Sequence, residues 1–165
     1  MSSTPRLGLP FLSAGQAQKE VFVNEALQTL DIVVAAAVEE PPRPTPPDTP
    51  QVGDTYIVSA SPSGAWTGKT NCLAAFTTGG WRFVAPKDGL SALEKLSGSY
   101  LTYREGAWEV GVIRGRGVFI DGTQVVGPRV ASIANPSGGS TVDSEARTAL
   151  IKVLAALRQH GLVES

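Results

Sequence analysis

The sequence predicts an α+β protein in which one helix at each end flanks a β-rich middle. Three patterns lead to this fold class: apolar residues at helical spacing over Leu12–Val38, short glycine-separated β segments over Gly53–Pro128, and helical spacing again over Thr141–His160. A proline-rich stretch follows the first helix. We therefore expect four parts, which span residues 1–40, 41–52, 53–128 and 129–165.

The first predicted helix has a clear start and a wide apolar surface. Ser13 and Gln16 have the spacing of a capping box, and Leu12 and Ala17 can form the hydrophobic staple around it. Apolar residues repeat at alternating spacings of four and three, which is the pattern of a coiled-coil seam: Val23, Leu27, Leu30, Val34 and Ala37. The surface is widened beyond one seam by Phe22, Ala26, Ile32, Val33 and Ala36. The helix, predicted over Ser13–Val38, should therefore contact two copies of itself in a parallel homotrimer.

Six prolines between Pro41 and Pro50 predict a stiff, extended segment after this helix. The segment could carry the chain away from the helix or run back along its outside. In both cases the helix would lack a partner within its own segment. Identical copies are the simplest source of one.

The middle of the chain predicts an antiparallel, meander-like β domain. Alternating apolar segments flank turns at Thr77–Gly80, at Arg104–Gly106 and at Asp121–Gly122. The Asp-Gly pair is the preferred sequence of a two-residue type I′ turn. Each hairpin is short, so several of them must share one small core.

The second predicted helix also has start and stop signals. Ser140 or Thr141 can cap it, and Gly161 fits a Schellman stop. Spacings of three and four residues separate Arg147, Leu150, Leu154, Leu157 and Gly161. This pattern suits association between copies and suits packing on the β domain equally well.

Several blocks of this sequence resemble a known family. They are "LGLPFLSAGQAQKEVFVNEALQTLD", "GDTYIV", "GAW" and "GGWRFVAP", in that order between Leu7 and Pro86. They resemble a domain of unknown function found in proteins of alphaproteobacterial prophages and gene-transfer agents, which are described as tail-fibre or host-specificity components. The closing "SGGSTVDSEARTALIKVLAALRQHGL" is similar to a segment that recurs in such phage proteins. The resemblance implies a trimeric structural fibre of a phage-like particle, bound to other particle proteins and made in the bacterial cytoplasm.

Composition excludes several other classes of protein. A net charge of −1 argues against nucleic acid as a partner. The longest apolar run, Ile32–Val38, is far shorter than the roughly 20 residues that span a bilayer, so we expect no membrane insertion. The amino terminus lacks the pattern of a signal peptide. Cys72 is the single cysteine, and we expect a small buried side chain in preference to a reactive thiol.

The sequence predicts no enzyme, no metal site and no cofactor. Gly64–Thr70 resembles a phosphate-binding loop but has three residues, where that loop needs four, between its first glycine and Gly-Lys-Thr. His160 is the only histidine and lies at a predicted helix end, so a Ser-His-Asp triad or a histidine-based metal site lacks its central part.

Tryptophans are the remaining candidates for a binding site. Trp66, Trp81 and Trp108 could stack on sugar rings of a host cell-surface glycan if they were exposed, most plausibly Trp66 in the loop Ser63–Gly68. The alternative, which we favour, is that they form the core of a small β domain. A glycan-binding module is therefore the second hypothesis beside the structural fibre.

Overall fold

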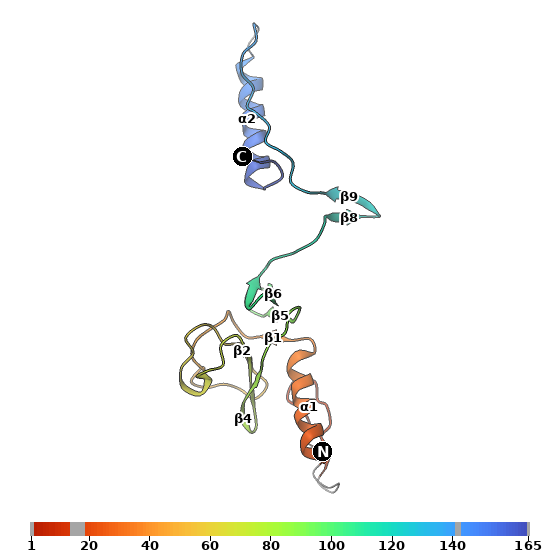
Figure 1. Ribbon diagram of the computed structural model, residues 1–165, viewed down its shortest axis with the longest axis vertical. Coiled ribbons are helices and arrows are strands. Elements are labelled where there is room, and N and C mark those ends of the chain that lie inside the picture. Colours follow the sequence, from red (N-terminus) through yellow and green to blue (C-terminus); the bar gives the residue numbers. More distant parts are fainter. Residues whose placement is uncertain (1, 14–18, 141–142, 165) are drawn as a thin grey trace. The chain divides into compact units, whose positions relative to one another are not determined.

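The computed structural model describes residues 2–13, 19–140 and 143–164. The chain forms two compact units, Met1–Val112 and Ile113–Ser165 (Figure 1). The first unit contains one helix, one 3₁₀ turn and seven strands among its described residues: α1 (Lys19–Val33), β1 (Ala37–Val38), β2 (Thr55–Ile57), η1 (Gly64–Trp66), β3 (Leu73–Thr77), β4 (Gly80–Val84), β5 (Ser91–Glu94), β6 (Tyr100–Arg104) and β7 (Ala107–Val110). The α+β class is confirmed.

The first unit contains two small sheets. One has the strand order β2-β3-β4 and is antiparallel. The other has the order β1-β5-β6-β7, and its β1–β5 pair is parallel. All the strand pairs within residues 53–128 are antiparallel, as predicted. The second sheet is mixed because β1, which comes from the segment directly after α1, pairs in parallel with β5.

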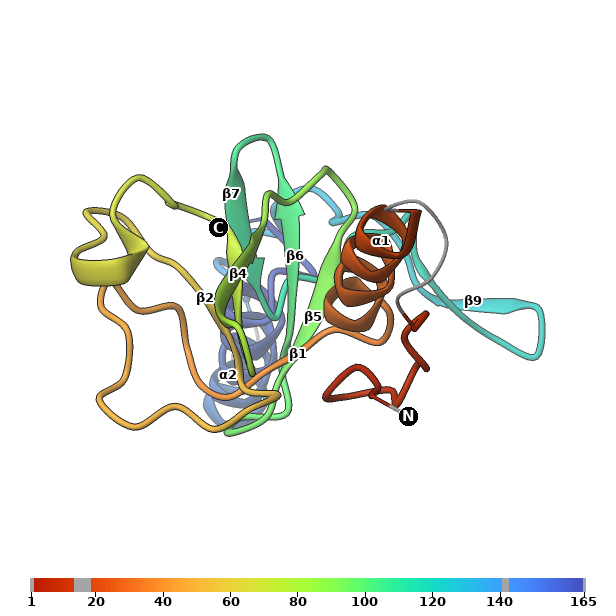
Figure 2. The same cartoon turned by 90° about the horizontal axis from the view of Figure 1, so that it is seen from below.

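Two clusters of buried side chains lie on opposite faces of the β2-β3-β4 sheet. Successive residues of a strand point to opposite faces, so β3 places Leu73 and Ala75 in one cluster and Ala74 in the other. The first cluster also contains Ile32 from α1 and Leu101 from β6. It therefore holds α1 and both sheets together, and Figure 2 shows α1 beside β5 and β1.

Helix α1 ends at Val33, five residues before the predicted end at Val38. The backbone leaves the helical conformation at Ala35, which has a φ of 47°. The guanidinium of Arg6 satisfies the carbonyl oxygens at this end: Nη1 donates to those of Asp31 and, at 3.2 Å, Ile32, and Nη2 donates at 2.8 Å to that of Ala35. Arginine commonly satisfies the last carbonyls of a helix in this way. The predicted capping box and staple involve Gln16 and Ala17, which lie outside the described residues.

The proline-rich segment lies along β2 within the first unit. Arg43 forms a parallel bridge with Val58, and its backbone NH donates at 3.1 Å to the carbonyl of Ile57. The NH of Ser63 donates at 3.0 Å to the carbonyl of Pro44. The segment thus takes neither of the two expected paths, because its free backbone groups are bonded to β2 and to the loop after it.

The three predicted turns are confirmed. β3 and β4 pair from Thr77↔Gly80, and β6 and β7 pair from Arg104↔Ala107. Asp121 and Gly122 have φ angles of 47° and 77°, as a type I′ turn requires.

The second unit contains a two-stranded ribbon and a helix among its described residues: β8 (Val118–Ile120), β9 (Thr123–Val126) and α2 (Ser144–Gln159). Asp143 caps α2, since its side chain accepts from the NH of Ala146 at 2.8 Å. The helix ends in the predicted Schellman stop, in which the NH of Leu162 donates at 3.0 Å to the carbonyl of Leu157. Of the two predicted caps, Thr141 lies outside the described residues and Ser140 is not the cap.

Candidate functional site

Helix α1 has two apolar faces with different surroundings. At about 100° per residue, Ile32 lies about 160° from Leu30 around the helix axis. Ile32 is buried in the core of the unit, whereas Leu30 remains 47% exposed. Val23 and Val34 share the Leu30 face and are exposed, and Leu27 is half-buried. Of the predicted seam, Val23, Leu27, Leu30 and Val34 form a stripe that points away from the core, and we call these four residues the α1 stripe. The fifth seam residue, Ala37, lies in β1, and the flanking Ile32 and Ala36 belong to the core, so the prediction that these three face other copies was wrong.

Exposed side chains next to the α1 stripe widen it. Phe22 is 79% exposed, and Ala26 is exposed between it and the stripe. Single exposed hydrophobic residues are common on protein surfaces, whereas these side chains form a row along one side of the helix.

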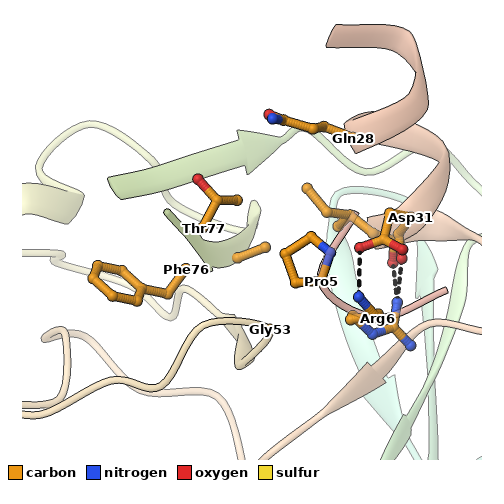
Figure 3. Close-up of a pocket in the computed structure, with 9 residues that line it drawn as sticks. Pro5, Arg6, Gln28, Asp31, Gly53, Phe76 and Thr77 are labelled. Carbon is orange, nitrogen blue, oxygen red and sulfur yellow. Dashed lines mark hydrogen bonds between the residues drawn. The ribbon is translucent and has the colours of Figure 1, made fainter. Parts of the chain in front are cut away.

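A buried carboxylate fixes α1 to the amino-terminal segment (Figure 3). Asp31 Oδ1 accepts from the Thr4 hydroxyl at 2.8 Å and from the backbone NH of Leu7 at 2.6 Å, and Oδ2 accepts from the NH of Arg6 at 3.1 Å. The adjoining cavity, lined in part by Pro5, has a volume of about 10 Å³, which is at most one water. This place is a structural joint, and it has no room for a ligand.

Trp66 is fully buried, so it is not the exposed indole that the glycan-binding hypothesis would need. The 3₁₀ turn Gly64–Trp66 directs the indole onto the outer face of β2-β3-β4, where its ring centre lies 5.8 Å from that of Tyr56 and 5.1 Å from that of Trp81. Trp81 is half-buried in the same cluster and contacts Phe76. These rings form core, as the favoured alternative predicted.

Trp108 belongs to a different place in the unit. Its indole NH donates at 2.9 Å to the carbonyl of Asn71, and its ring packs edge-on against Tyr103 at 5.4 Å. It is half-buried against the first core cluster. The three tryptophans therefore do not form a single site: two share one aromatic cluster, and the third lies in another.

A polar cleft of about 270 Å³ lies between α1 and the edge strand β4. Its lining includes Trp81 from the aromatic cluster, and Arg82, which forms a 2.6 Å ion pair with Glu25 of α1. Lys69 lies over the ring of Phe83, 5.3 Å from its centre. These groups give the cleft both charge signs and one aromatic wall.

The second unit exposes apolar side chains from both of its elements. In the ribbon, these are Val118, Phe119, Ile120, Val125 and Val126. In α2, they are Leu150, Ile151 and Val153. Of the predicted α2 seam, Leu154 is buried and Leu150 is exposed, so the unit covers the seam only in part.

Groups that could carry chemistry are sparse. In residues 2–13, 19–140 and 143–164, no three histidine, cysteine, aspartate or glutamate side chains lie close enough together to hold a metal ion. Burial raises the pKa of the Cys72 thiol, which disfavours the reactive thiolate. Gly64–Trp66 forms a 3₁₀ turn, so this stretch does not open an α-helix as a phosphate-binding loop does. None of the described helices has the length and apolarity needed to cross a bilayer.

The sequence did not predict that Asp31 and Arg6 join α1 to the amino-terminal segment. One signal was present: Asp31 interrupts an otherwise apolar run between Leu30 and Ile32. A carboxylate in such a run must either face water or find donors, because burying it unpaired is costly. Nothing local identifies Arg6 as its neighbour, since the two are 25 residues apart.

The fold and its surfaces define a small α+β protein with an exposed apolar helix stripe and a carboxy-terminal unit with a small core. The chain belongs to the family described as "Protein of unknown function (DUF2793)", whose model matches residues 23–109, more than half of the 165 residues. No curated protein matches the chain, and no solved structure does.

Proposed function

We propose that this chain is a homotrimeric structural component of a phage-like particle, a fibre or a connector within a fibre. The observation that carries the proposal is the α1 stripe, in which Leu30 is 47% exposed on a helix whose opposite face already forms the core. A helix with one face committed to its own fold and a second apolar face left open is suited to association between copies.

The width of the exposed surface favours three copies over two. Phe22 lies about 100° around the helix from Val23, so one flat partner could not cover both. In a three-chain bundle each helix is covered from two directions, and closed rotational symmetry places the same stripe at every interface. The parallel arrangement keeps the three β-rich units at the same end of the bundle.

The assignment to a phage-like particle rests on two regions of the sequence that resemble proteins of such particles. One is Leu7–Pro86, and the other lies near the carboxy terminus. An exposed apolar surface on α1 agrees with a structural role. The proposed partners are therefore further copies of the chain and other proteins of the particle. Contact with the host surface is part of this proposal only if the protein lies at the fibre tip.

The α1 stripe is tested by Leu30→Asp with Val21→Asp as its control, because Val21 is also exposed but lies about 180° around the helix from Leu30. Leu30 is half exposed in the single chain, so the variant should fold, but it places a charge at each interface of a bundle. We expect the concentration at which the oligomer half-dissociates to rise at least tenfold, with little change for Val21→Asp. An unchanged dissociation midpoint for Leu30→Asp would refute association through α1.

The particle assignment is tested in the bacterium that encodes the chain. We expect a tagged chain to co-purify with phage-like particles on a density gradient and to appear at fixed stoichiometry by mass spectrometry. A strain that lacks the gene should release particles that lack a fibre by electron microscopy. If purified particles never contain the chain, the assignment is wrong.

Glycan binding is the second candidate, and the polar cleft between α1 and β4 favours it. Sugar sites combine an aromatic wall with polar groups for hydroxyls, and here Trp81 lies beside Lys69 and Arg82. The buried Gln28 Oε1 at the same cleft has no hydrogen-bond partner among the described residues. The cleft could thus hold one sugar unit.

The cleft is tested on an array of bacterial surface glycans. If it binds sugar, the parent protein should retain at least one glycan, Lys69→Ala should weaken that binding about tenfold, and Lys87→Ala, an exposed lysine outside the cleft, should not. A parent protein that retains nothing on the array would remove this candidate.

A further inference from the structure

The second unit has a very small core of its own. Among its described residues, Leu154 and Val163 are the only buried apolar side chains. A unit of about 50 residues normally buries more than half of the surface of its unfolded chain, and units that cannot do so need disulfides, metals or association. Cys72, the only cysteine, lies in the first unit. The second unit must therefore gain its core from contacts outside itself.

The β8–β9 ribbon has apolar side chains on both faces. Phe119 and Ile120, which follow the irregularity in register after Val118, point to opposite faces because side chains alternate along a strand, and both are exposed. The sheet consists of these two strands, and an isolated two-stranded ribbon is marginally stable at best. A single neighbour would cover one face and leave the other in water.

Helix α2 is covered on one side by the chain of its own unit. Val130 bridges to Val163, and Arg158 donates to the carbonyl of Ile133 and, at 3.0 Å, to Asn135 Oδ1. This stretch therefore runs beside the carboxy-terminal end of the helix.

The side of α2 that stays open carries an apolar stripe. Ala146, Leu150 and Val153 are spaced by four and three residues and are exposed, with Leu150 at 53%. This is the spacing of a coiled-coil seam and matches that of the α1 stripe. We call these three residues the α2 stripe.

We infer that the second unit is a separate association module whose core forms between copies, with ribbons packing against ribbons and α2 stripes against α2 stripes. The inference rests on the proposed trimer and adds a second interface to it. Each copy in a threefold ring has two neighbours, which is what a ribbon with two apolar faces requires. A partner on one side, such as the first unit or an unrelated protein, would leave one face uncovered.

Site-specific cross-linking of the full chain tests this contact. In a Cys72→Ser background, Val153→Cys on the α2 stripe and Phe119→Cys on the ribbon should each give a covalent pair of chains with a short bifunctional maleimide. Lys152→Cys, about 160° around the helix from Leu150, is the control and should cross-link at least tenfold less.

Gly117 allows the ribbon to be disturbed without altering its apolar surface. A Cβ on Gly117 would lie 2.6 Å from the carbonyl oxygen of Val126, so alanine forces the two strands apart. A Cβ on Gly115 would meet nothing closer than 3.8 Å, which makes Gly115→Ala the matched control. We expect Gly117→Ala to reduce the Phe119→Cys cross-link at least tenfold and Gly115→Ala to leave it unchanged.

The outcomes separate this inference from the proposed function. A trimer in which Leu30→Cys on α1 cross-links while Val153→Cys and Phe119→Cys do not would overturn the inference and leave the trimer standing. A monomer without any cross-link would overturn both. Cross-linking of Phe119→Cys that persists in Gly117→Ala would show that the ribbon is not an ordered part of the interface and would also overturn the inference.

Discussion

The Thr4 hydroxyl donates a 2.8 Å hydrogen bond to the buried carboxylate of Asp31, 27 residues further along the chain. Both side chains are almost inaccessible to solvent. Because the backbone NH groups of Arg6 and Leu7 share the same carboxylate, this contact joins the amino-terminal segment to α1.

Asp31→Ala should lower the free energy of unfolding of the first unit by ~2–4 kcal/mol, since it leaves buried donors without an acceptor. Asp48→Ala, at an exposed position of the same unit, should change it by less than ~0.5 kcal/mol. Hydrogen exchange of the Arg6 and Leu7 amides should also accelerate in Asp31→Ala alone. Equal changes in the free energy of unfolding for the two substitutions would show that the contact between Asp31 and the amino-terminal segment does not stabilise the unit.

Ala35→Gly should stabilise the first unit by ~1 kcal/mol, because Ala35 holds a φ of 47°, where glycine has no steric penalty. Ala26→Gly, at an exposed site within α1, should destabilise it by about the same amount. Denaturant unfolding at fixed protein concentration measures both. If Ala35→Gly lowers the stability instead, α1 does not end at Val33.

The end of α1 could not be predicted from the local sequence. The run from Val33 to Val38 is apolar and carries no glycine or proline, so local propensity continues the helix. Arg6, which satisfies the last carbonyls, comes from a distant segment, and β1 gains a parallel pairing with β5 that no local pattern encodes. The hairpins were predictable because their turns are specified by adjacent residues.

Trp66→Ala should cost ~3–5 kcal/mol of stability, as expected for removing a buried aromatic side chain. Trp66→Phe should cost much less, because the aromatic contact is kept and the buried indole NH, which has no partner among the described residues, is removed. Thermal unfolding compares the two variants. Similar, small effects of both would indicate that Trp66 lies at the surface.

The position of Trp66 illustrates why the candidate site was harder to predict than the fold. Glycines and serines on both sides of Trp66 are typical of an exposed loop. Trp66 is buried because no other described element covers the outer face of β2-β3-β4 in this cluster. The loop that carries Trp66 packs the indole onto this face. The α1 stripe was predictable because helical spacing alone places Val23, Leu27, Leu30 and Val34 on one face.

Acid should weaken the first unit in part through Glu94. Its pKa is lowered mainly because the Ser97 hydroxyl donates to the carboxylate, with further donation from the NH groups of Leu96 and Ser97. A lowered folded pKa gives stability that is present above the ordinary value of 4.5 and is lost as pH falls through the folded value.

Glu94→Gln should therefore flatten the loss of stability between about pH 5 and pH 3, while Glu105→Gln, at an exposed turn, should keep the parent profile. Denaturant midpoints across this range, at one protein concentration, report the difference. A Glu94→Gln profile as steep as the parent's would contradict the role of this carboxylate.

Trimerisation is the central claim, and the mass of the intact chain in solution tests it most directly. Sedimentation equilibrium at micromolar concentration should give three times the chain mass of 17.2 kDa, about 52 kDa. The same mass should persist at higher salt, because the proposed contacts are apolar. A single species of 17.2 kDa at these concentrations would contradict the account.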